Sequence, residues 1–168
     1  LDLGTGSGAL AVSFLSFCRD ARGVAVDISG EALAVAKNNA EKAGVAERLE
    51  FRQGDFLQAL QEGETFDVIL SNPPYIPTAD LAGLAPEVRR EPALALDGGP
   101  DGLKFYRILG AQAVHFLKSG GLLAVEVGIH QADAVQAMFR AGGLEAVSCL
   151  KDYGGIERAV CGRRPQAV

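Results

Sequence analysis

The sequence predicts an α/β fold with a mostly parallel, seven-stranded sheet. Short apolar segments of strand length alternate with longer segments of helical periodicity over the whole 168 residues. Alternation of this kind is typical of a parallel sheet with helices on both faces. Only a short turn joins the last two apolar segments, so we expect the final strand to run antiparallel. No composition shift or repeat divides the chain, which predicts one domain over residues 1–168.

The expected elements follow from these patterns. Ser29 is placed to cap the helix that starts near Glu31, and Gly44 to end it. The stretch 76–101 is expected to be irregular, and its charged run 87–91 is a candidate for a substrate-facing lid, with a solvated loop as the alternative. Strands are expected at 1–3, 24–28, 49–53, 66–71, 122–127, 146–150 and 157–162, and helices from the first glycine-rich turn to about 18, and at 31–43, 103–117 and 131–141.

Composition limits the class of protein. A formal net charge of −5 argues against a nucleic-acid partner. The three scattered cysteines form no C-x-x-C pair, which is typical of reduced thiols in a cytoplasmic protein. The two distant histidines, His115 and His130, predict no metal site. The apolar runs are too short to cross a membrane. Because the chain opens inside an apolar strand, we expect a missing N-terminal segment.

A glycine-rich turn, Gly4-Thr5-Gly6-Ser7-Gly8, follows the first predicted strand. Glycines allow a tight turn and a close approach of the backbone to a ligand. A nicotinamide dinucleotide site requires G-x-G-x-x-G, whereas here the third glycine falls one residue earlier. This spacing favours a nucleoside with an amino-acid tail, and a turn without a ligand is the alternative.

Two further strand ends carry groups that suit a nucleoside. Asp27 ends the second predicted strand, where a carboxylate accepts hydrogen bonds from both hydroxyls of a ribose. Asp55 follows the third strand and can accept from an adenine amino group, while the Phe56 ring covers the adenine face. The alternatives are a helix-capping aspartate for Asp27, and a turn aspartate and a core phenylalanine for Asp55 and Phe56.

The segment Asn72-Pro73-Pro74-Tyr75 ends the fourth predicted strand and is the most informative motif. The two prolines fix their own φ angles and hold Asn72 away from helix. They also remove two backbone donors, which leaves the Asn72 side-chain oxygen and the Pro73 carbonyl as acceptors. A planar NH2 group has two N–H donors for this pair, and Tyr75 offers a flat face for stacking. A proline turn that only closes the strand is the alternative.

Together these residues resemble class I methyltransferases that act on planar nitrogens. The segments that carry the resemblance are 1–8, 25–27, 54–56 and 71–76. Two more, 91–96 with 98–103 and 151–158, are similar to the bacterial release-factor glutamine methyltransferases of the HemK or PrmC family. The resemblance covers essentially the whole chain. It departs at Phe56, where relatives often have tryptophan, and in lacking the helical domain that precedes the family's catalytic domain.

The resemblance implies transfer of a methyl group from S-adenosylmethionine, leaving S-adenosylhomocysteine, to N5 of the glutamine in a Gly-Gly-Gln motif. The implied partner is a peptide chain release factor. A ribosomal-protein glutamine and an adenine N6 in a nucleic acid are the alternative acceptors. The implied site consists of cofactor-binding Gly4, Thr5, Gly6, Ser7, Gly8, Asp27, Asp55, Phe56 and Asn72, substrate-binding Asn72, Pro73, Pro74 and Tyr75, and catalytic Asn72, Pro73 and Tyr75, with no metal.

Overall fold

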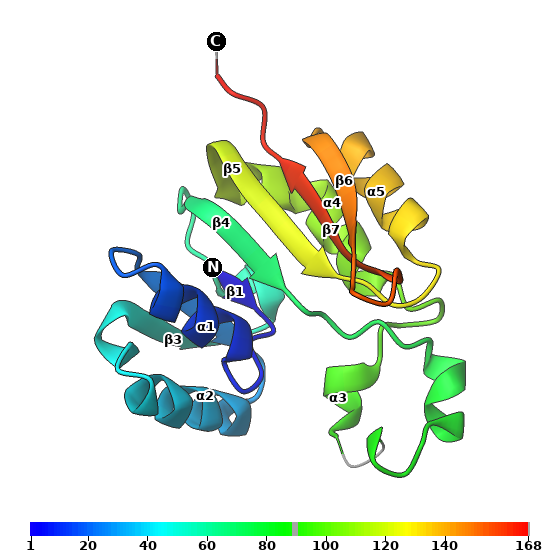
Figure 1. The fold of residues 1–168 in the computed structure, drawn as a ribbon, viewed down its shortest axis with the longest axis horizontal. Coiled ribbons are helices and arrows are strands. Elements are labelled where there is room, and N and C mark those ends of the chain that lie inside the picture. The colour runs from blue at the N-terminus through cyan, green and yellow to red at the C-terminus, as the bar shows by residue number, and fades with distance from the viewer. Residues whose placement is uncertain (89–90, 168) are drawn as a thin grey trace. The chain divides into compact units, whose positions relative to one another are not determined.

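The computed structural model describes residues 1–88 and 91–167. Its strands form one seven-stranded sheet in the order β3-β2-β1-β4-β5-β7-β6 (Figure 1). The chain divides into two compact units, Leu1–Glu64 with Ile69–Asn72, and Thr65–Val68 with Pro73–Val168. The predicted α/β class is confirmed, because the first three strand pairs are parallel and the pairs that involve β7 are antiparallel.

The first unit contains the predicted alternation of strands and helices. Ser29 caps α2 as expected, since its hydroxyl oxygen accepts a hydrogen bond from the Ala32 N–H at 3.2 Å. Gly44 follows α2 with a φ of 70°, which only glycine adopts readily. The elements of this unit are β1 (Asp2–Leu3), α1 (Ala9–Phe17), β2 (Gly23–Asp27), α2 (Gly30–Lys42), η1 (Ala46–Arg48), β3 (Leu49–Gln53), η2 (Phe56–Ala59) and the last residues of β4 (Phe66–Ser71).

The registers bring the carboxyl ends of four strands to one edge of the first unit. Leu3 pairs with Val26 on one side and with Ser71 on the other. Asp27 pairs with Gln53, the last residue of β3. All these pairs are parallel, so the residues that follow each strand emerge at the same edge. This is the edge at which ligands bind in parallel α/β sheets.

The second unit is built on antiparallel strands and two long helices. Its core includes buried side chains of α4, β5, α5 and β7, among them Tyr106, Leu123, Phe139 and Val160. The elements of this unit are the first residues of β4, η3 (Thr78–Gly83), α3 (Ala93–Leu96), α4 (Lys104–Phe116), β5 (Leu117–Glu126), α5 (Ala132–Ala141), β6 (Glu145–Lys151) and β7 (Glu157–Arg163).

The predicted start of β5 at residue 122 is wrong, because the strand begins at Leu117. Gly120 and Gly121 suggested a turn, but the chain after β7 pairs with them. The Gly120 N–H donates to the Arg164 carbonyl at 3.1 Å, and the Arg164 N–H donates to the Gly121 carbonyl at 2.9 Å. A Cβ on Gly121 would lie 3.1 Å from the Phe66 carbonyl oxygen. Gly121 is therefore glycine because a neighbouring backbone lies close, not because the strand ends there.

The stretch between β4 and α4 is also more ordered than the sequence predicted. It contains η3 and α3, and its ends are joined by a parallel bridge between Ile76 and Asp97 (green in Figure 1). The Ile76 N–H donates to the Leu96 carbonyl at 3.0 Å, and the Gly98 N–H donates to the Ile76 carbonyl at 2.8 Å. Arg89 and Arg90 of the predicted lid lie outside the described residues, and the lid stays a prediction.

Two glycines allow α4 and the end of α5 to pack closely, and they give a stability prediction. A Cβ on Gly142 would lie 1.6 Å from the Gly110 carbonyl oxygen. We expect Gly142→Ala to lower the free energy of unfolding by at least about 1–3 kcal/mol, since the helices must move apart. Urea unfolding measures the loss. Gly83→Ala is the matched control, because no atom lies within 4 Å of its added Cβ, and equal stability of the two variants would contradict the prediction.

Candidate cofactor and acceptor sites

The glycine-rich turn after β1 adopts a backbone that requires glycine. Gly4, Gly6 and Gly8 have φ values of 67°, 55° and 81°. A Cβ on Gly4 or Gly6 would meet no atom within 4 Å, so protein packing does not explain these glycines. A Cβ on Gly8 would lie 3.0 Å from the Cβ of Ala36, so this glycine allows α2 to approach α1. The first two glycines thus leave an open backbone surface that a ligand can approach.

Hydrogen bonds hold this turn on both sides. The Thr5 N–H donates to the Val26 carbonyl at 2.9 Å, and the Asn39 side-chain amide donates to the Ser7 carbonyl at 2.9 Å. Beneath the turn, Oδ2 of the buried Asp2 accepts from the Thr5 hydroxyl at 2.6 Å and from the Ala11 N–H at 3.1 Å. The loop geometry is therefore set before any ligand binds.

Asp2 is itself unusual, because its other oxygen, Oδ1, is buried and has no hydrogen-bond partner among the described residues. Burial raises the pKa of this carboxyl, and the bonds from Thr5 and Ala11 offset the shift only in part. An acid whose pKa is higher in the folded protein than in the unfolded chain binds more protons when folded. It therefore favours folding at low pH, and its contribution is lost as pH rises from the unfolded to the folded pKa.

We expect Asp2→Asn to raise the free energy of unfolding at neutral pH. The amide oxygen can still accept from Thr5 and Ala11, and no buried charge remains. Thermal unfolding at several pH values checks this. The gain should shrink as pH falls below the folded pKa of Asp2, and an Asp2→Asn protein that is less stable than the wild type at neutral pH would contradict the account.

Asp27 lies at the end of β2, as predicted, and is half-buried. Its Oδ2 accepts from the Gly6 N–H at 2.8 Å, and its Oδ1 accepts from the Ser29 N–H at 2.9 Å. An ionised carboxylate offers about four acceptor positions, so roughly two remain for a ligand. The hydrogen bond from the Ser29 N–H is compatible with the alternative that Asp27 only caps the following helix. The hydrogen bond from the Gly6 N–H, however, also connects Asp27 directly to the glycine-rich turn.

Asp55 and Phe56 follow β3 on the same edge. The Gly54 N–H donates to the Asp27 carbonyl at 3.0 Å, which holds this loop against the end of β2. Asp55 is exposed, and no hydrogen bond from the described residues reaches its side chain. Phe56 is buried and has a φ of 52°, a strained value for a residue with a side chain. Packing of the Phe56 ring in the unit is thus established, and its contact with an adenine stays a prediction.

Asn72 begins the segment that runs from the first unit into the second. Its side chain is exposed directly after β4, and Pro73 is buried. Within residues 1–88 and 91–167, neither the Asn72 side chain nor the Pro73 carbonyl forms a hydrogen bond with another protein group. Ser71, the residue before them, is fixed by a 2.7 Å bond from its hydroxyl to the Leu3 carbonyl. Neither of the two acceptors predicted from the sequence is therefore used in a hydrogen bond within the described residues.

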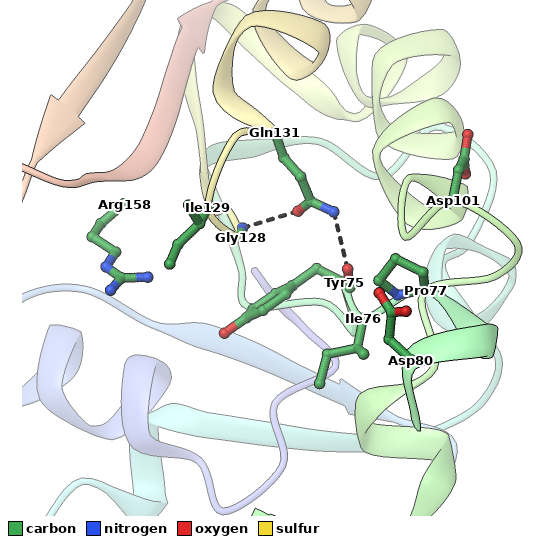
Figure 2. A pocket seen from close by; sticks show the side chains of 9 residues that line it. All are labelled: Tyr75, Ile76, Pro77, Asp80, Asp101, Gly128, Ile129, Gln131 and Arg158. Carbon is green, nitrogen blue, oxygen red and sulfur yellow. Dashed lines mark hydrogen bonds between the residues drawn. The ribbon is translucent and has the colours of Figure 1, made fainter. Parts of the chain in front are cut away.

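Tyr75 lies in the second unit, in the wall of a pocket of about 470 Å³. Burial and the nearby Glu126 raise the pKa of the Tyr75 phenol, so it remains protonated at neutral pH. The pocket also contains Arg158, which forms an ion pair of 3.0 Å with Asp152. Figure 2 shows its nine lining residues, namely Tyr75, Ile76, Pro77, Asp80, Asp101, Gly128, Ile129, Gln131 and Arg158.

Two polar residues at these sites, Asp2 and Gln131, are absent from the set predicted from the sequence. For Asp2 the available signal is a carboxylate within an apolar strand end, beside the glycine-rich turn. Gln131 is predicted only to begin a helix. Its side chain contacts groups near residues 75, 102 and 128, and such distant partners leave no local pattern in a sequence. Among the described residues, no three His, Cys, Asp or Glu side chains are grouped so that they could hold a metal ion.

The fold and the glycine-rich turn with Asp27 define an α/β domain of the methyltransferase type. A family model described as "Methyltransferase domain" matches residues 1–151, and the chain belongs to that family. None of the helices within the described part of the chain has the length and apolar character needed to span a membrane.

The chain is also similar to proteins named "Release factor glutamine methyltransferase". It is 51% identical over 158 residues to the one from Moorella thermoacetica, covering 94% of this chain and 56% of that protein. It is 47% identical over 163 residues to the one from Caulobacter vibrioides, and this match covers 96% of this chain and 56% of that protein. The chain thus spans a little over half the length of these relatives.

Solved structures agree on the fold. A methyltransferase from Pyrococcus furiosus superimposes with a TM-score of 0.72 at 20% identity, over 98% of this chain and 73% of that one. An RNA methyltransferase from Salinibacter ruber, in complex with S-adenosyl-L-homocysteine, gives a TM-score of 0.59 at 21% identity. This match covers 99% of this chain and 80% of that one. At these identities the likeness establishes the common fold and nothing about substrate.

Proposed function

We propose that this chain is the catalytic part of an enzyme that transfers a methyl group from S-adenosylmethionine to the side-chain amide nitrogen of a glutamine in a peptide chain release factor. The observation that carries the proposal is the exposed Asn72 side chain next to the Pro73 carbonyl at the end of β4, two acceptors that form no hydrogen bond with the residues that the structure describes. The similarity to relatives named for this activity supports it.

The residues of the first unit fit the proposed cofactor. Gly4, Gly6 and their turn leave an open backbone surface for the methionine and ribose parts, and Asp27 retains acceptor positions for the ribose hydroxyls. Asp55 is free to accept from the adenine amino group, beside Phe56. When bound, S-adenosylmethionine supplies a methyl group on a positively charged sulfur, which is a strong electrophile.

The acceptors act on the glutamine amide. An amide nitrogen is a poor nucleophile because its lone pair is delocalised into the carbonyl group. Oδ1 of Asn72 and the Pro73 carbonyl accept one hydrogen bond each from its two N–H groups. Both bonds return electron density to the nitrogen and fix its orientation, and positioning of this kind supplies a large share of catalysis in a displacement. Tyr75, protonated at neutral pH, would provide a flat face for the amide rather than a base. As the nitrogen takes the methyl group, the bond from the methyl carbon to sulfur would break, S-adenosylhomocysteine would leave, and one N–H proton would pass to solvent.

A release factor is the proposed protein partner, with Gly-Gly-Gln as the segment that is modified. The net charge of −5 supports a protein over a nucleic acid, because an acidic surface repels phosphates. We also propose that residues 1–168 form a catalytic domain. The match of residues 1–151 to the methyltransferase family model supports this assignment.

A labelled-methyl assay with three acceptors tests the proposal. The protein is incubated with S-adenosylmethionine and with a release factor, a ribosomal-protein mixture or DNA. We expect label in the release factor alone, and loss of that label when the glutamine of its Gly-Gly-Gln segment is replaced. Cofactor binding by calorimetry is the control for a folded, competent protein. Cofactor binding without label in the release factor, or label in DNA, would reject the proposed substrate.

A further inference from the structure

The side chain of Gln131 connects three segments of the second unit. It precedes α5, and its Nε2 donates to the Tyr75 carbonyl at 2.9 Å and faces the Gly102 carbonyl at 3.4 Å. Its Oε1 accepts from the Gly128 N–H at 2.9 Å. Figure 2 shows the amide between Gly128 and Tyr75, with one hydrogen bond to each. The environment fixes which end is nitrogen, because two carbonyls face one end and an N–H faces the other.

Glycines surround the backbone of Tyr75 at contact distance. A Cβ on Gly98 would lie 2.8 Å from the Tyr75 Cα, and one on Gly102 would lie 2.3 Å from the Tyr75 carbonyl oxygen. A Cβ on Gly128 would lie 3.0 Å from the Tyr75 ring and 2.8 Å from Oε1 of Gln131. Two loops, the one between α3 and α4 and the one between β5 and α5, thus approach Tyr75 at contact distance. The side chain that hydrogen-bonds to the Tyr75 backbone there is Gln131.

We propose that Gln131 is a positioning residue for methyl transfer, which fixes the Tyr75 backbone and, through the two rigid prolines before it, the carbonyl of Pro73. This inference rests on the proposed function for its catalytic consequence. Gln131 touches no reacting atom in this account.

Only a side chain with a donor and an acceptor on one planar group satisfies both neighbours. An ionised carboxylate of the same shape would accept from Gly128 but would face two carbonyl oxygens without a donor. A protonated carboxyl has both a donor and an acceptor, since its O–H can donate to the Tyr75 carbonyl and its other oxygen can accept from Gly128. Lowering the pH should therefore restore the missing donor in the variant Gln131→Glu, because protonation of the carboxylate changes its hydrogen bonding but not its shape.

The test measures Gln131→Glu against the wild type at several pH values. At about pH 8, where an ordinary glutamate is ionised, we expect kcat for methyl transfer to a release factor to fall by on the order of 10- to 100-fold, as for a misplaced reacting group. The Kd for S-adenosylmethionine should stay unchanged. The ratio of variant to wild-type kcat should rise toward one as pH falls. Comparing the two proteins at equal pH removes effects that they share, including those of the other charged groups that line the pocket, namely Asp80, Asp101 and Arg158.

A second readout is independent of the substrate. The chain has three tyrosines and no tryptophan, so the ring resonances of Tyr75 can be assigned with Tyr→Phe variants. We expect these resonances to shift or broaden in Gln131→Glu at about pH 8 and to return at low pH, with those of Tyr153 unchanged. Gln136→Glu is the matched control, because it is the same substitution in α5 at a side chain that accepts a hydrogen bond from Arg140 at 3.0 Å, and it should match the wild type.

The outcomes separate the two claims. A wild-type protein that binds the cofactor but methylates no release factor rejects the proposed function, and the Tyr75 resonances then decide alone whether Gln131 fixes Tyr75. Unchanged Tyr75 resonances in Gln131→Glu overturn the inference. A changed resonance with an unchanged kcat overturns it equally, because Gln131 would then be structural without being a positioning residue.

Discussion

We expect Asn72→Ala to lower kcat for methyl transfer by on the order of 10²–10³-fold, while the Kd for S-adenosylmethionine stays nearly unchanged. The loss is typical of removing one positioned polar group from a transition state. The Asn72 side chain is exposed and makes no protein hydrogen bond among the described residues, so its removal should cost little stability. Steady-state kinetics at saturating cofactor and release factor measure kcat, and calorimetry measures Kd for the cofactor.

Asn38→Ala provides the matched control for this experiment. Asn38 lies on the exposed face of α2 and is the same residue type. It should keep the wild-type kcat and Kd. If Asn72→Ala weakened cofactor binding as much as it lowered kcat, Asn72 would belong to the cofactor site and the acceptor account would be wrong.

For Asp27→Asn we expect weaker binding of S-adenosylmethionine with little change in kcat. This change removes the charge and replaces one acceptor oxygen with an NH2 group, which would face the N–H of Gly6 or Ser29. A hydrogen bond to a charged group contributes roughly 1.5–3 kcal/mol, so we expect the Kd for S-adenosylmethionine to rise by roughly 10- to 100-fold. At saturating cofactor, kcat should remain close to the wild-type value.

Asp20→Asn is the control for Asp27, because Asp20 is exposed in the turn before β2 and makes no hydrogen bond to the described residues. Isothermal titration of both variants gives the comparison. An unchanged Kd in Asp27→Asn would mean that Asp27 only holds the turns at Gly6 and Ser29, as the capping alternative states.

Much of the fold could be predicted because its signals are local. β3 and β4 have the predicted bounds, since β3 alternates apolar and polar residues and β4 is a mostly apolar segment that ends before Asn72. The Ser29 cap and the glycine at position 44 follow from rules about single helix ends. The strand ends also converge as expected, because parallel pairing of β1 with β2 and β4 determines which residues share an edge.

The parts that the sequence did not predict depend on contacts between distant segments. Gly121 looks like a turn residue until the close approach of Phe66 is known. The bridge between Ile76 and Asp97 joins residues about twenty positions apart through backbone groups, which have no residue-type signature. The role of Gln131 at the acceptor site could not be predicted for the same reason, because it depends on contacts between distant segments. Its partners are a carbonyl and an N–H, and only the three-dimensional structure reveals them.

The most direct measurement of the central claim is the position of the methyl group on the product. A release factor is incubated with this protein and S-adenosylmethionine, digested, and mapped by tandem mass spectrometry. The account predicts one added methyl group, on the side-chain nitrogen of the glutamine in the Gly-Gly-Gln segment, and far less of this product in the same time with the Asn72→Ala protein. A methyl group on an oxygen, on a lysine or arginine nitrogen, or on any other residue would contradict it.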